Sequence, residues 1–98
     1  YSDCFVLEGN EANTGFKVDA DIHTKSIYPL SDNTHDLGST SKRWRDIYTG
    51  DLNLSNEGRS NDVDGTWGNW TLQEGEDDIF MINNRTGKKY SIMLREVD

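Results

Sequence analysis

The sequence predicts a mainly β fold, from alternating side chains, short turns and the absence of any long helical pattern. Apolar and polar residues alternate over 16–23 and again over 51–55. A period of two is typical of a strand with one buried face, because successive side chains point to opposite sides. In the last third, three apolar segments are separated by glycine-containing turns. This spacing predicts a three-stranded antiparallel meander.

The composition limits what the chain can bury by itself. Of its 98 residues, 33% are hydrophobic and 29% are charged, and the formal net charge is −8. Only 20 residues are Leu, Ile, Val or Phe, close to the roughly 20% below which a highly charged chain is expected to be disordered. Ten aromatic residues, however, supply large apolar faces. We therefore expect a small β module that completes its core with further copies of itself.

The same composition argues against several classes of function. Nucleic-acid binding depends on Lys and Arg that neutralise phosphates, whereas acidic residues outnumber basic ones by 18 to 10. No apolar run approaches the roughly 18 residues of a membrane-spanning helix. Cys4 is the single cysteine, and only His23 and His35 could serve it as a base, so we expect no disulfide and no catalytic cysteine. We also expect no cofactor.

We divide the chain into three segments of one compact unit. Residues 1–30 are predicted to form a β segment of short strands that ends at Pro29, because proline cannot donate to a strand ladder. Residues 31–55 are predicted to form a polar turn, a short helical turn over 42–46 after the capping residues at 39–41, and then short strands. Residues 56–98 contain a loop over 56–65 and the meander.

The middle of the chain resembles a known protein family. Residues 28–48 contain a proline-led turn, Asp-Leu-Gly-Ser at 36–39, a basic and aromatic turn at 42–45, and Ile-Tyr at 47–48. This order resembles a recurrent segment near the distal end of bacteriophage tail-fibre and tailspike proteins. The run before Pro29 is similar to the short strands of fibre shafts, and residues 76–90 look like the C-terminal end of such virion proteins.

The resemblance implies an intertwined homotrimer, attached to the rest of a tail fibre in the virion, that meets the host receptor outside the cell. Many relatives carry a self-cleaving chaperone of more than about a hundred residues after this segment. Only fifty residues follow Tyr48 here, so we do not transfer autoproteolysis to this chain. The expected trimer core consists of apolar residues from the middle and last segments: Leu37, Trp44, Ile47, Tyr48, Trp70, Phe80 and Ile82.

Two acidic segments suggest chemistry, but each has a simpler interpretation. Asp62 and Asp64 with Gly65 suggest a calcium loop, yet the EF-hand spacing then places threonine where the bidentate acid belongs, so we predict an Asx-rich turn without metal. Glu74 to Asp78 places four acids around one glycine. A glycosidase needs two carboxylates facing each other across a sugar, so we predict a solvated turn and no catalytic residues.

The best binding candidate is the segment from Trp67 to Trp70. An aromatic face with amide and acidic groups nearby is typical of sugar binding, so we select Trp67, Asn69, Asp62 and Asp64 as a glycan-binding set. The two tryptophans are three positions apart and point to opposite faces of a regular strand. Trp70 is then the core residue and Trp67 the exposed one, although trimer core for both is the simpler interpretation.

The sequence thus predicts the distal domain of a phage tail fibre, a trimeric, non-enzymatic module that presents a receptor-recognition surface to a cell-surface polysaccharide. One alternative is a purely structural trimerisation or capping module that never contacts a receptor. A monomeric carbohydrate-binding module and a fragment of a glycan-active enzyme are the others. Because the chain starts at Tyr1 and not at methionine, we expect it to be part of a longer protein.

Overall fold

A computed structural model describes residues 15–98 of the chain. The contacts between residues divide the chain into two units, Tyr1–Ser39 and Thr40–Asp98. The described part of the first unit, 15–39, contains turns and bends but no helix or strand. In one of the turns, the Thr34 hydroxyl donates to the carbonyl oxygen of Asp32 at 2.8 Å. The strand predicted over 16–22 is not formed in the single chain, because a strand needs a partner for its backbone groups. The rest of that predicted β segment, 1–14, lies outside the described residues, as does Cys4.

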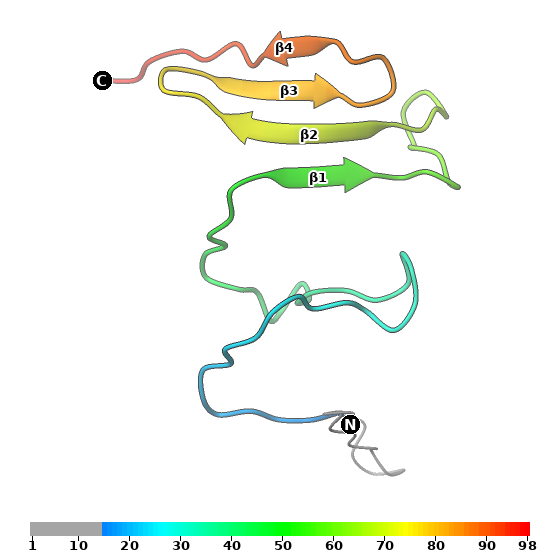
Figure 1. Cartoon of the computed structure of the whole chain (residues 1–98), viewed down its shortest axis with the longest axis vertical. Coiled ribbons are helices and arrows are strands. Elements are labelled where there is room, and N and C mark those ends of the chain that lie inside the picture. Colours follow the sequence, from blue (N-terminus) through cyan, green and yellow to red (C-terminus); the bar gives the residue numbers. More distant parts are fainter. Residues whose placement is uncertain (1–14) are drawn as a thin grey trace. The chain divides into compact units, whose positions relative to one another are not determined.

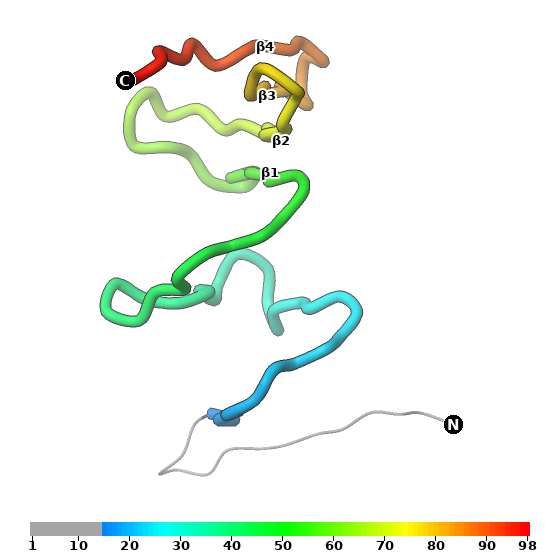
Figure 2. Tube along the Cα trace, turned by 90° about the vertical axis from the view of Figure 1, so that its left-hand side faces the viewer, coloured from blue at the N-terminus to red at the C-terminus, as the bar shows by residue number. Residues whose placement is uncertain are grey.

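The second unit contains one antiparallel sheet of four strands (Figure 1). The strands are β1 (Leu52–Ser55), β2 (Asn69–Glu74), β3 (Ile79–Asn83) and β4 (Lys89–Ser91). Each strand pairs with the next in the sequence, so the order across the sheet is β1-β2-β3-β4. Figure 2 shows the four strands following one another in a single layer.

The mainly β class predicted from the sequence is confirmed, with differences in detail. The strand expected over 51–55 is β1, and it joins β2 to β4 in one sheet of four strands instead of lying apart from a three-stranded meander. The last strand is shorter than the predicted 90–97. Its partner β3 begins at Ile79. The Ile92 amide donates to the Ile79 carbonyl at 2.9 Å, and β3 has no earlier residue with which the chain after Ile92 could pair.

The helical turn predicted over 42–46 is wrong, since this stretch is irregular with isolated bends. The expectation rested on the serine and threonine capping residues before it. A single turn gains few hydrogen bonds for the backbone freedom it loses, so capping residues alone do not stabilise it. Arg45 Nε lies 3.4 Å from Asp46 Oδ2, and an exposed pair of this kind contributes little to stability. The short strand expected at 47–48 is also absent.

The register places most apolar strand residues on one side of the sheet. Leu52 lies opposite Leu72, Leu72 opposite Met81, and Met81 opposite Tyr90, so one row crosses all four strands. The Trp70 and Tyr90 rings approach to 5.7 Å between centroids on the same side. We call this side the apolar face, and its members are Leu52, Leu54, Trp70, Leu72, Ile79, Met81 and Tyr90.

A network of polar side chains covers part of the opposite face. Its centre is Thr71, whose hydroxyl donates to Asn53 Oδ1 at 2.6 Å and accepts from Asn84 Nδ2 at 2.9 Å. Asn84 Nδ2 also donates to Asn69 Oδ1 at 3.0 Å. These bonds tie β1, β2 and the β3–β4 turn together. We call this arrangement the polar network.

The described part of the chain has no buried hydrophobic side chain, and Thr71, 8% exposed, is its only buried residue. The expected trimer-core residues of the middle segment are open to solvent, with exposed fractions from 64% for Trp44 to 91% for Tyr48. Phe80 is 36% exposed. Trp70 and Ile82 are half-buried. Among the described residues, the sheet therefore has an apolar face on which no side chain is buried.

Candidate functional site

A groove of about 800 Å³ lies where the β1–β2 connection and the β3–β4 turn come together at one end of the sheet. Both loops lie at the same end because β1 and β3 run in the same direction (Figure 1). The end of β1, the residues leading into β2 and the turn after β3 all contribute to the lining. Residues as far apart in the sequence as Leu54 and Thr86 are thus brought to one surface.

The β1–β2 connection is ordered by a cluster of hydrogen bonds around Asn61. Its Oδ1 accepts from the amides of Val63 and Asp64 at 2.8 and 2.9 Å, and its Nδ2 donates to Asp64 Oδ1 at 2.8 Å. Asp64 Oδ1 also accepts from the hydroxyl and amide of Thr66 at 2.7 and 3.1 Å. Gly65 has a φ of +75°, which favours glycine because a Cβ atom strains this conformation. The Asx-rich turn expected here therefore takes the form of a hydrogen-bonded loop.

These hydrogen bonds stabilise the ionised form of Asp64. The Thr66 hydroxyl, followed by the Asn61 amide and the Thr66 backbone, holds the pKa of this carboxyl below its ordinary value. Because the folded-state pKa is lowered, the contribution to stability is complete above the unfolded pKa of about 4. It is lost as the pH falls through the lowered value.

We therefore expect an NMR titration of the Asp64 carboxyl to give a pKa below that of an unstructured aspartate. The Thr66→Val variant removes the largest cause and should shift this pKa upward, towards the ordinary value. Thr34→Val, which removes a hydroxyl far along the sequence from this loop, should leave it unchanged. A pKa of Asp64 that is already ordinary in the unmodified chain would contradict the loop geometry.

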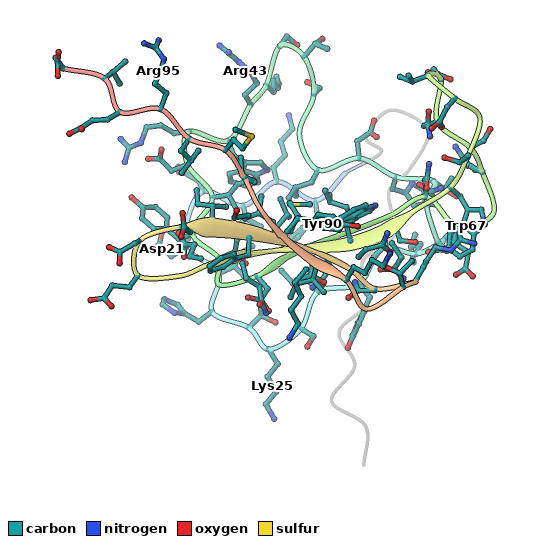
Figure 3. The ribbon with its side chains drawn as sticks, turned by 90° about the horizontal axis from the view of Figure 1, so that it is seen from above. Asp21, Lys25, Arg43, Trp67, Tyr90 and Arg95 are labelled. Carbon is teal, nitrogen blue, oxygen red and sulfur yellow. The ribbon has the colours of Figure 1, made fainter. Side chains whose placement is uncertain are left out.

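Trp67 is held at the groove by a basic residue from the other loop. The guanidinium carbon of Arg85 lies 3.7 Å from the centroid of the Trp67 ring system, a cation–π contact. Arg85 Nη1 also donates to the Trp67 carbonyl at 2.8 Å. The neighbouring Gly68 amide donates to Asn56 Oδ1 at 2.7 Å. Figure 3 shows Trp67 at the loop end of the sheet and Tyr90 nearer the middle of the strands in the same view.

The four residues selected from the sequence for glycan binding are not brought together in one surface. Of these, Trp67 lines the groove, whereas Asn69, Asp62 and Asp64 do not. Asn69 belongs to the polar network, Asp64 holds its own loop, and Asp62 is exposed on the loop.

Arg85 is one of several groove residues, with Asn56 and Thr86, that the sequence did not indicate as binding residues. Its basic stretch, which continues through Lys88 and Lys89, was visible in the sequence. Its position beside a tryptophan 18 residues earlier depends on the strand pairing.

Within residues 15–98, no group of three His, Cys, Asp or Glu side chains is placed to hold a metal ion. The same part of the chain contains no helix that is long and apolar enough to cross a membrane. Comparison with protein-family models, with curated proteins and with solved structures finds no match to this chain.

Proposed function

We propose that this chain is a distal β module of a bacteriophage tail fibre that assembles as a homotrimer. Its loops present a surface that recognises a polysaccharide receptor on the host cell, and the proposal includes no catalytic step. The observation that carries it is the open apolar face of the sheet. The sequence resemblance described above supplies the class of protein, and the groove at the loop end supplies a candidate contact surface.

An uncovered apolar face is a strong reason for association. Leu52, Leu54 and Tyr90 are each about half exposed in the single chain, with exposed fractions of 45%, 50% and 47%. Full burial of an aliphatic side chain stabilises by about 1.5–3 kcal/mol relative to exposure. A chain with no buried apolar residue among those described gains little of this energy alone. Three copies around an axis would bury the three apolar faces against one another.

The edges of the sheet support the same conclusion. The strands β1 and β4 each pair on one side only within the described chain. An exposed edge strand tends to pair with another chain unless it is covered. Closed rotational symmetry covers such edges and limits assembly to a fixed number of copies. A closed homotrimer, the assembly that the sequence resemblance implies, would cover the edges and the apolar face together.

The test is the mass in solution, measured by light scattering after size-exclusion chromatography. We expect a species of three 11.2 kDa chains. The Leu72→Asp variant places a charge on the apolar face and should give monomers that are largely unfolded, whereas Val63→Asp, at a loop position that is 95% exposed, should remain trimeric. A folded monomer of the unmodified chain would contradict the proposal.

One observation favours a second candidate, a structural trimerisation or capping module that never contacts a receptor. Arg85 covers one face of the Trp67 ring, and that face cannot stack on a sugar. Competition with phage adsorption to host cells separates the two candidates. The receptor-binding module should reduce adsorption when added in excess, whereas the structural module should have no effect while it remains trimeric.

A further inference from the structure

The groove between the β1–β2 connection and the β3–β4 turn, which we call the loop-end groove, has a positively charged lining although the chain is acidic. The chain as a whole carries 18 acidic residues and a net charge of −8. The lining nevertheless contains no carboxylate, and Arg85 is its single charged side chain. In a groove of this kind, one positive charge lies among neutral polar and aromatic groups, and this arrangement favours a ligand that carries a negative charge.

Arg85 is positioned before any ligand arrives. Its guanidinium group stacks on Trp67 and donates through Nη1 to the Trp67 carbonyl. The turn that carries it is fixed by Asn83 Oδ1, which accepts from the amides of Arg85 and Thr86 at 2.9 and 3.3 Å. The bond to Trp67 uses one of the five N–H donors of a guanidinium group. The remaining donors keep the planar fork geometry that suits two-point binding of a carboxylate.

The rest of the lining suits a ring with both apolar and polar sides. Trp67 contributes aromatic surface, and Ser55, Asn56 and Thr86 contribute hydroxyl and amide groups, whereas Leu54 and Trp70 belong to the apolar face. A sugar ring has the same mixture of C–H surface and hydroxyl groups, and pockets for small ligands commonly combine aromatic walls with a few placed polar groups.

We propose that the loop-end groove binds an acidic sugar unit of the host polysaccharide, with the carboxylate of the sugar paired to the Arg85 guanidinium. This inference rests on the proposed function and specifies its ligand. A carboxylate is favoured over a phosphate monoester because the groove lining offers one positive charge. A phosphate monoester carries about −1.5 to −2 at neutral pH and would leave part of that charge without a partner in the lining.

The role of each groove residue follows from this pairing. Arg85 recognises the charge, and Trp67 is a positioning residue that orients the guanidinium. A charge-assisted hydrogen bond of this type is about twice as strong as a neutral one. Loss of the Arg85 charge should therefore weaken binding of acidic sugars by roughly ten- to a hundredfold, and it should have little effect on neutral sugars.

The test compares acidic oligosaccharides with their carboxyl-reduced counterparts, which keep the ring and linkage but lose the charge. Oligogalacturonate, oligoglucuronate and oligosialic acid serve as probes, and binding is measured by titration calorimetry and by tryptophan fluorescence. We expect at least one acidic probe to bind more tightly than its reduced counterpart. Arg85→Gln should remove that difference, and Arg85→Lys, which keeps the charge without the fork, should retain part of it.

Arg95→Gln is the matched control. It makes the same change of charge at a position far from Trp67 in Figure 3 and outside the lining of the groove. The difference between acidic and reduced probes should be unchanged in this variant. Equal losses in the two variants would show a general effect of charge and would overturn the assignment of the carboxylate to Arg85.

Two further results would overturn this inference while the proposed function stands. The first is a trimer that binds no acidic probe more tightly than the reduced counterpart. The second is a loss of trimer in Arg85→Gln, which would show that Arg85 and its contacts with Trp67 are needed for assembly. If the unmodified chain is not a trimer, the proposed function itself fails, and light scattering before each titration distinguishes that case.

Discussion

Replacement of Trp70 by alanine is expected to unfold the sheet and to abolish assembly. Trp70 lies on the apolar face at the loop end of β2, opposite Leu54 on one side and Asn83 on the other. Its ring approaches that of Tyr90 from two strands away, so it joins β2 to β4 across β3. Truncation of a large aromatic residue in a packed core costs about 3–5 kcal/mol, a large share of the roughly 5–15 kcal/mol by which a domain is stable.

The measurement is the midpoint of chemical denaturation, followed by circular dichroism, together with the mass from light scattering. Trp70→Phe keeps an aromatic ring on the apolar face and should retain the trimer with a reduced midpoint. Val63→Ala, in the exposed loop, should behave like the unmodified chain. A trimer of unchanged stability in Trp70→Ala would show that the apolar face does not form the interface.

Replacement of Thr71 by valine is expected to give the second-largest loss of stability. Valine has almost the same shape and suits a strand, but it lacks the hydroxyl at the centre of the polar network. Asn53 Oδ1 would lose its donor, and Asn84 Nδ2 would lose one of its two acceptors. The two hydrogen bonds of the Thr71 hydroxyl contribute about 0.5–1.5 kcal/mol each, and Thr71 is the one buried residue among those described.

Thr71→Ser is the matched variant, because it keeps the hydroxyl and removes only a methyl group. We expect it to lose much less stability than Thr71→Val in the same denaturation experiment. Amide exchange at Asn84 gives a local measure, since its amide donates to the Asn69 carbonyl at 2.8 Å beside the network. Equal losses in the two variants would show that packing of the methyl group, and not the hydrogen bonds, stabilises this position.

The candidate site could be predicted only in part from the sequence, because its residues come from two separate loops. Trp67 could be selected because it neighbours a polar loop, and this required only local sequence. The contact between Trp67 and Arg85 could not be predicted, because it depends on the β1–β2 connection and the β3–β4 turn meeting at one end of the sheet. For Asp64, the sequence indicated an Asx-rich turn next to Gly65, and only the structure shows which groups of Asn61 and Thr66 its carboxylate contacts.

The sequence by itself determined the mainly β class and the approximate positions of the four strands that form, because a period of two depends only on neighbouring residues. It also predicted strands over 16–22 and 47–48 that do not form. Only the tertiary structure decided which side chains share a face. Trp70 pairs with Asn83 and Thr71 with Ile82, so Phe80 and Ile82 lie on the face opposite Trp70, although all three were expected in one core. The register set by the β2–β3 turn fixes this arrangement, since a shift of one residue would exchange the two faces of β3.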